Sequence, residues 1–260
     1  MSAELKLLIA VSRCLPTLRG AGRIAEWIRR WYARKPRPVE IFQVNGMRME
    51  LDPCQCMDGA LLFYPHLYDR MEIGFLRQTL AGGGVFVDAG ANIGYYTLVA
   101  SHLSDRVYAI CIEADPSTFV RLERNIALNG LTNVVAVHAG ISNKRERLTL
   151  WRNEGGNLSG NSFDPSYESG NGVAVECDTL HQLLVAHGVD RIDVIKLDIE
   201  GFERRVLKKF FAESAIRPEY VIIEENPAYD EDGACGRLLR EHRYRVLCSA
   251  GVNRIYKLLH

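Results

Sequence analysis

Several features that would mark a particular class of protein are scarce or missing from this sequence. The 260 residues hold seven cysteines, an odd number without metal-site spacing, which argues against a disulfide framework and against a zinc site. No apolar run approaches the ~18 residues that a membrane-spanning helix requires. The apolar stretch from Leu7 to Val11 is too short for a secretory signal and follows Glu4. We therefore expect a cytoplasmic protein with reduced thiols.

An excess of either charge is also missing, because 32 Lys and Arg residues balance 32 Asp and Glu residues. A general nucleic-acid binder needs a basic surplus, so we expect no nucleic-acid partner. The balance is nevertheless uneven along the chain. Residues 1–40 hold nine basic and three acidic residues, a net charge of +6, and the remainder carries −6.

The basic N-terminal stretch is predicted to form two helical pieces, within residues 4–33, that break around Pro16 to Gly22. The second piece carries four apolar residues on one face, Ile24, Trp27, Ile28 and Trp31, and arginines surround this face. Two interpretations stay open. The helix docks on the rest of the protein with its basic residues in water, or residues 4–34 touch a membrane surface or a partner.

A hairpin and further helix are predicted next. Asn45-Gly46 is typical of a two-residue hairpin turn, and it lies between predicted strands at residues 39–44 and 47–51. Residues 58–80 are predicted to be mostly helical. The polar and aromatic side chains in this segment belong either to the core or to the cover of a bound ligand: Tyr64, His66, Tyr68 and Glu72.

The stretch from Val85 to Gly94, V-F-V-D-A-G-A-N-I-G, is the strongest local signal in the chain. A buried strand runs into Asp88, and Gly90 and Gly94 then frame a turn into a predicted helix from Tyr95 to His102. Glycine suits such a turn because a backbone that lies against a ligand leaves no room for Cβ and often needs a positive φ. The helix N-terminus offers unpaired N–H groups to a carboxylate or phosphate.

The spacing of this turn favours one ligand over another. A dinucleotide-binding turn reads G-x-G-x-x-G, but here Asn92 fills the place of the middle glycine. The acid Asp88, two residues before the first glycine, suits a ligand with an amine and no phosphate, such as S-adenosylmethionine. A nicotinamide-dependent oxidoreductase remains the alternative.

Strands alternate with helices from Val85 onward, which predicts an α/β fold with a mostly parallel sheet covered by helices on both faces. We expect an N-terminal appendage, residues 1–80, and a main domain, residues 81–260. The later strands are expected at residues 107–112, 134–138, 192–197 and 220–223, with a closing antiparallel hairpin at 244–248 and 253–258.

Between two short extra strands, at residues 148–151 and 173–176, lies a segment rich in Gly, Ser and Asn. A loop as long as residues 153–172 is usually a lid, a binding loop or disordered. We expect it to shape the pocket for a substrate.

Carboxylates end two of the predicted strands. Glu113 follows the second strand, where it can accept hydrogen bonds from a ribose diol. Asp198 and Glu200 follow the fourth strand, and they project together with Lys196 if the strand geometry persists. Such carboxylates can serve as a general base or hold a substrate hydroxyl. Asp198 can instead cap the helix predicted over residues 200–211.

Three segments in this order, V-D-A-G-A-N-I-G-Y-Y-T, I-E-A-D-P and I-D-V-I-K-L-D-I-E-G-F-E, closely resemble the FkbM family of S-adenosylmethionine-dependent methyltransferases. The resemblance runs from about Gly84 to Asn226. It implies the seven-stranded, Rossmann-like sheet of class I methyltransferases. It also implies methylation of a hydroxyl oxygen on a sugar, glycolipid or polyketide-type acceptor.

The resemblance further implies roles for individual residues. The cofactor's methionine part is expected against Asp88, Gly90, Asn92 and Gly94, its ribose against Glu113 and Ala114, and its adenine near Gly140 and Ile141. Asp198 and Glu200 are expected to face the transferred methyl group and the acceptor. One departure is Thr179-Leu180-His181, where the family pattern has an acid at the third position. A binding module that keeps the fold without catalysis stays an alternative, and we predict no resident metal.

Overall fold

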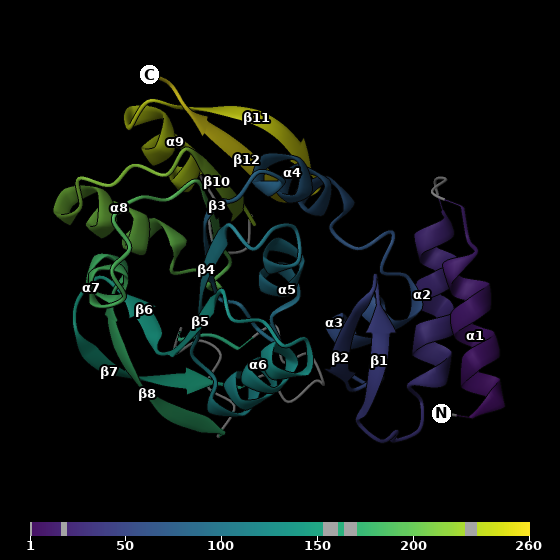
Figure 1. Cartoon of the computed structure of the whole chain (residues 1–260). Helices are drawn as coiled ribbons and strands as arrows, with labels where there is room; N and C mark the ends of the chain where they lie inside the picture. Colours follow the sequence, from purple (N-terminus) through teal and green to yellow (C-terminus); the bar gives the residue numbers. More distant parts are fainter. Residues whose placement is uncertain (1, 17–19, 153–160, 164–170, 227–232) are drawn as a thin grey trace.

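A central sheet of seven strands forms the core of the protein, shown as a computed structural model in Figure 1. The structure describes residues 2–16, 20–152, 161–163, 171–226 and 233–260. The strand order is β11-β12-β10-β9-β3-β4-β5. The strands are β3 (Gly84–Ala89), β4 (Val107–Glu113), β5 (Val134–His138), β9 (Val194–Leu197), β10 (Tyr220–Glu224), β11 (Tyr244–Ala250) and β12 (Asn253–Leu258).

Parallel pairing joins β5, β4, β3, β9 and β10, whereas β12 pairs antiparallel with both β10 and β11. This confirms the predicted mostly parallel sheet with a C-terminal antiparallel hairpin, which is the class I methyltransferase architecture. From β3 the chain first adds β4 and β5 on one side, and it then returns to add β9 and β10 on the other side, so the switch point lies between β3 and β9. In open sheets of this kind, ligands bind at the carboxyl ends of the strands beside such a switch point.

Helices cover both faces of this sheet. The strands are apolar on both sides, so neighbouring residues such as Phe86 and Val87 enter separate hydrophobic clusters. The Phe86 side is covered by α4 (Arg70–Leu80) and α5 (Tyr95–Ser101), with α6 (Pro116–Leu128) beside them; the Val87 side is covered by α7 (Leu180–Ala186), α8 (Glu203–Glu213) and α9 (Ala234–Glu241).

The N-terminal residues form a helical and hairpin extension, as expected. It consists of α1 (Ala3–Arg13), α2 (Ala21–Tyr32), β1 (Glu40–Val44), β2 (Met47–Leu51) and α3 (Cys56–Phe63). The hairpin turn has φ of 50° at Asn45 and 87° at Gly46, the paired positive values that an Asn-Gly turn supplies. Met49 and Leu61 share one hydrophobic cluster with Phe86, so the extension and the sheet have a continuous core.

A second sheet, of three strands in the order β6-β8-β7, contains the two extra strands that the sequence predicts. They are β7 (Glu146–Trp151) and β8 (Gly172–Thr179), and β6 (Gly140–Ser142) was not predicted. The segment 58–80 is mostly helical, as predicted, and residues 64–69, which contain Pro65, separate α3 from α4. One helical prediction needs correction. Helix α8 starts at Glu203, three residues later than expected, because Glu200 and Gly201 have φ of 52° and 96°.

We expect Asn125→Ala to destabilise the protein by about 2–4 kcal/mol, because it leaves two buried backbone groups without a partner. The Asn125 side chain is fully buried; it accepts from the Glu50 N–H at 2.7 Å and donates to the Ile93 carbonyl at 2.9 Å. Urea unfolding measures this difference. The control is Arg124→Ala in the same helix, which removes an exposed ion pair to Glu50 and should cost less than about 1 kcal/mol. Equal effects of the two changes would contradict the prediction.

Candidate active site

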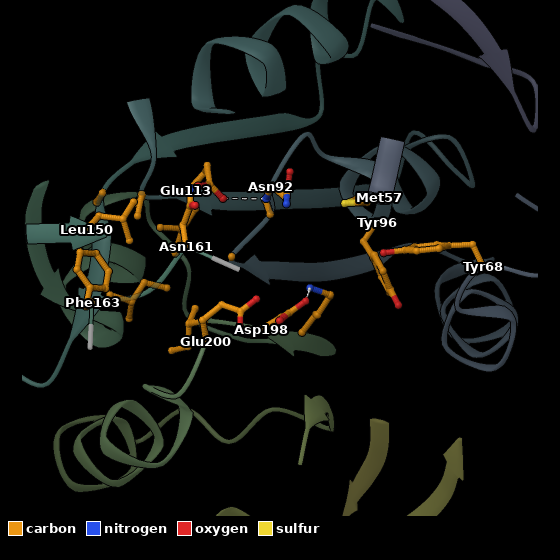
Figure 2. Close-up of a pocket in the computed structure, with 18 residues that line it drawn as sticks. Met57, Tyr68, Asn92, Tyr96, Glu113, Leu150, Asn161, Phe163, Asp198 and Glu200 are labelled. Carbon is orange, nitrogen blue, oxygen red and sulfur yellow. Dashed lines mark hydrogen bonds and ion pairs between the residues drawn. The ribbon is translucent and has the colours of Figure 1, made fainter. Parts of the chain in front are cut away.

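A pocket opens at the carboxyl ends of β3, β4 and β9, at the switch point of the sheet (Figure 2). The space inside it, with its open side included, is about 850 Å³. Glu113 and Asn92 lie on one wall, and Asp198 and Glu200 lie on the wall opposite. Leu150 closes one end.

The floor of the pocket is bare backbone at Gly90. A Cβ on this residue would lie 1.8 Å from the carbonyl oxygen of Asp198, and φ is 80°. The turn is fixed further because the N–H groups of Gly90 and Ala91 both donate to the carbonyl of Ile112 at 3.0 Å. Asn92, with φ of 51°, adopts the left-handed conformation that Asn tolerates better than most residues. A ligand can therefore lie directly against main-chain atoms here.

Glu113 presents a fixed carboxylate to the pocket from the end of β4. Its Oε2 accepts from the Asn92 N–H at 2.8 Å and its Oε1 accepts from the Asp115 N–H at 2.9 Å. Burial raises the pKa of Glu113 to about 7, although these backbone bonds oppose the shift. Each carboxylate oxygen has two lone pairs, so both can accept a further bond from a ligand. The side chain is thus held ready for a pair of hydroxyl groups.

One end of the pocket is apolar. Ile141 of β6, Leu150 of β7 and Phe163 line it, so the three-stranded sheet supplies most of this wall. Trp151 and Ser162 exchange backbone hydrogen bonds of 2.8 and 3.0 Å, which hold Phe163 in place beside the strand. A flat apolar group such as an adenine ring fits this end.

A buried charged centre lies where β3 and β9 meet. The Lys196 ammonium donates to Asp198 Oδ2 at 2.9 Å, and it lies 4.0 Å from Asp88 Oδ1 and 5.0 Å from the centre of the Tyr96 ring. Burial lowers the pKa of Lys196, but the charges of Asp198 and Asp88 outweigh burial and raise it above its ordinary value. Lys196 therefore stays protonated and fixes the orientation of Asp198.

The segment after Asp198 is held by a second carboxylate. Glu203 accepts from the N–H groups of Ile199 and Gly201 at 2.8 and 3.0 Å, which fixes the turn before α8. The N-cap residue of α8 is Phe202, so Asp198 does not cap this helix. The Ser162 hydroxyl donates to the carbonyl of Glu200 at 3.1 Å. The strand geometry assumed from sequence ends at Leu197, yet this turn still brings Glu200 to the pocket.

The other end of the pocket is aromatic. Tyr96 of α5 and Tyr68 lie there beside Met57 of α3 (Figure 2). The Tyr96 hydroxyl donates to Asp69 at 2.8 Å, and burial raises the pKa of Asp69 to about 6. Met57 comes from the N-terminal extension and Tyr68 from the segment between α3 and α4, so the extension is part of the pocket wall.

The structure brings most of the predicted site residues together. Those that line the pocket are Gly90, Asn92, Glu113, Ala114, Ile141, Asp198 and Glu200. Three others lie outside its lining. Asp88 is buried and accepts from the N–H and hydroxyl of Thr97, Gly94 caps α5 against Leu122, and Gly140 packs on Cys177. Asp88 lies 4.0 Å from the ammonium of Lys196, which does line the pocket.

Several lining residues were not predicted from the sequence. They include Met57, Tyr96 and Leu150. Asn161 and Phe163 also line the pocket, and they belong to the segment 153–172 that was expected to shape it; residues 153–160 and 164–170 of that segment lie outside the described residues. Tyr96 follows the glycine turn by two residues, and that closeness is a signal that could have identified it. Of the four candidates in residues 64–72, only Tyr68 lines the pocket; Tyr64 bonds to Glu26 and His66 to the Leu15 carbonyl. Within the described ranges, no group of three or more His, Cys, Asp or Glu residues is arranged to hold a metal ion.

Comparison with known sequences identifies the family. The sequence model described as the methyltransferase FkbM domain matches residues 88–246, more than half of the chain. The chain belongs to the FkbM methyltransferase family. It is an S-adenosylmethionine-dependent methyltransferase, and the oxidoreductase alternative is therefore set aside.

The individual proteins that resemble this chain are only distantly similar to it in sequence. Methyltransferase sdnD of Sordaria araneosa is 27% identical over 215 residues, which span 65% of this chain and 80% of the relative. A rat (Rattus norvegicus) tRNA wybutosine-synthesizing protein 2 homolog is 28% identical over 112 residues, 41% of this chain but only 24% of that protein. Among solved structures, a putative caffeoyl-CoA O-methyltransferase from Staphylococcus aureus is similar over 74% of this chain and 84% of its own, with 12% identity and a TM-score of 0.48.

The residues of the pocket fit S-adenosylmethionine. The Gly90 floor has no room for a side chain and leaves main-chain atoms for the methionine part to lie against. The pinned carboxylate of Glu113 suits the ribose diol, and the end formed by Ile141, Leu150 and Phe163 suits the adenine. When bound, this cofactor supplies a methyl group on a positively charged sulfur.

We expect Gly90→Ala to abolish cofactor binding, because the new methyl group would collide with the Asp198 carbonyl and force the turn away from the pocket floor. Calorimetric titration with S-adenosylhomocysteine measures the loss. Gly82→Ala is the control, since a Cβ there meets no atom within 4 Å and should leave affinity unchanged. An unaltered affinity in Gly90→Ala would contradict the assignment of the pocket floor.

We also expect the affinity for S-adenosylhomocysteine to rise by about tenfold from pH 6 to pH 8. Only the ionised Glu113 carboxylate accepts bonds from both ribose hydroxyls, and a pKa of about 7 makes the ionised fraction grow over this interval. Glu113→Gln should bind more weakly with little pH dependence, whereas Glu176→Gln, a change at an exposed residue of β8, should behave as wild type. The same pH profile in Glu113→Gln would assign the titration to another group.

Proposed function

We propose that the protein methylates a hydroxyl oxygen of a small, glycan-linked or lipid-linked acceptor, such as a sugar, a glycolipid or a polyketide-type compound. The observation that carries this proposal is the pair of carboxylates, Asp198 and Glu200, on one wall of the cofactor pocket. Methylation of a hydroxyl releases a proton, and a carboxylate beside the acceptor is the group that can receive it.

The contact of Asp198 with Lys196 supports separate roles for the two carboxylates. The Lys196 ammonium lies 2.9 Å from Asp198 Oδ2, so this carboxylate is held in a fixed position, which suits an anchor for the acceptor hydroxyl. Lys196 occupies Oδ2, and the second carboxylate oxygen can accept a bond from the acceptor hydroxyl. We assign the anchoring of the hydroxyl to Asp198 and the removal of its proton to Glu200. Alignment of the hydroxyl oxygen contributes about 7–11 kcal/mol in reactions of this type.

The aromatic end of the pocket supports an acceptor with both apolar surface and hydroxyl groups. Tyr68, Tyr96 and Met57 offer apolar area next to Asp198, and a sugar ring or an oxygenated carbon chain has both properties. A nucleic-acid acceptor is less well matched. The chain as a whole has no basic surplus, and a carboxylate-lined wall repels a phosphate backbone.

Transfer of a tritiated methyl group from S-adenosylmethionine to fractionated cell extract tests the proposal. We expect label in the small-molecule or lipid fraction, in an ether linkage that survives mild alkaline hydrolysis. Label in RNA, or label released by mild base as from a methyl ester, would contradict it. Binding of S-adenosylmethionine without transfer to any fraction would favour the non-catalytic binding module.

With an acceptor in hand, Glu200→Gln should lower kcat by about 10²–10⁴-fold, the usual contribution of a general base. Its affinity for S-adenosylhomocysteine should stay within about twofold of wild type, because the proton acceptor contributes mainly in the transition state. Glu241→Gln, a change at the exposed end of α9, is the control for the loss of one charge. Full turnover by Glu200→Gln would exclude this residue as the base.

A further inference from the structure

The outer surface of the first two helices carries large apolar side chains that the fold leaves uncovered. On α1, Leu7 is 65% exposed and Val11 is 49% exposed. On α2, Ile24, Trp27 and Trp31 are 53%, 65% and 40% exposed, and these two tryptophans are two of only three in the chain. The spacings of four residues on α1, and of three and four on α2, place each set on one side of its helix.

A different side of each helix is already packed, so the exposed side chains are not the face by which the helix contacts the rest of the protein. Leu5 of α1 is buried, as are Ile28 and Tyr32 of α2, and both helices contact α3. Figure 1 shows the two helices side by side at the edge of the molecule, away from the C-terminal hairpin. The exposed apolar side chains therefore point out of a folded structure.

Positive charge accompanies this apolar surface. The exposed basic residues of this region are Lys6, Arg23, Arg30, Arg34 and Lys35. Of the acidic residues nearby, Glu26 is engaged by Arg29 and Arg30 and by the Tyr64 hydroxyl. Glu4 is exposed as well, so the exposed charged side chains of this region, five basic against one acidic, are basic overall.

We infer that α1 and α2 dock the protein on the surface of an anionic phospholipid bilayer. Tryptophan and branched aliphatic side chains beside arginine and lysine are the composition of helices that lie in the interface of such a membrane. The two helices have 11 and 12 residues, about 16–18 Å in length, which is short of the ~30 Å hydrocarbon layer. Across the ranges that the structure describes, no helix is long and apolar enough to cross a membrane, so this contact is peripheral.

Charge complementarity favours a lipid surface over other partners. A second copy of the chain on this face would bring two basic surfaces together, which like charges oppose. RNA would match the charge. Proteins bind RNA through basic grooves and through stacking of bases on aromatic rings, and the exposed aliphatic side chains of Leu7, Val11 and Ile24 supply neither. The docking inference does not depend on the proposed hydroxyl methylation. It has one structural link to the site, since α3, on which both helices pack, carries Met57 of the pocket.

Flotation of the full-length protein with vesicles tests the inference. We expect it to float with vesicles of phosphatidylcholine containing about one-third phosphatidylserine, and to remain largely unbound with phosphatidylcholine alone. The double change Trp27→Glu and Trp31→Glu should reduce the bound fraction by at least about tenfold, as should Arg23→Glu with Arg34→Glu. High salt should weaken binding of the wild type.

A matched control separates docking from damage to the fold. Val120→Glu with Val185→Glu adds two charges at side chains of similar exposure, 52% and 53%, on α6 and α7, and should float as wild type does. All variants should keep the wild-type affinity for S-adenosylhomocysteine. Three results would overturn the inference: no flotation with anionic vesicles, equal flotation of the tryptophan variant and wild type, or binding of mixed tRNA in place of vesicles with the same variants defective.

Discussion

The close approach of two backbone segments at the switch point of the sheet is the constraint on which the site depends. The turn at Gly90 lies against the carbonyl of Asp198, and the Asp198 N–H donates to the Ala89 carbonyl at 3.0 Å. Because no side chain fits between them, the glycine turn and the end of β9 form one continuous floor. Everything else at the site is arranged around that floor.

Beside this floor, the protein keeps a buried lysine between two carboxylates. An unpaired charge at this depth is unfavourable, so Lys196 and its partners Asp88 and Asp198 depend on one another. Asp88 also ties the start of α5 through Thr97. A single set of charges therefore joins the strand that carries the glycine turn, the helix that follows it and the carboxylate assigned to the acceptor.

Much of this could be read from the sequence because it is encoded locally. Apolar strands that run into Asp88, Glu113 or Asp198 predict the carboxyl ends of the strands of a parallel sheet, where ligands bind. Asn45-Gly46 predicts the hairpin turn in which it lies. The position of Glu200 depends on positive φ values that periodicity does not reveal. Met57 and Leu150 reach the pocket only through tertiary packing of the N-terminal extension and the three-stranded sheet, and no short-range pattern records such packing.

A crystal structure with S-adenosylhomocysteine tests the assignment of the pocket most directly. We predict that the ribose hydroxyls bond to the carboxylate of Glu113 and that the adenine lies against Ile141 and Phe163. The sulfur should then face the wall of Asp198 and Glu200. A ligand bound with its ribose away from Glu113, or bound at another part of the chain, would contradict the assignment.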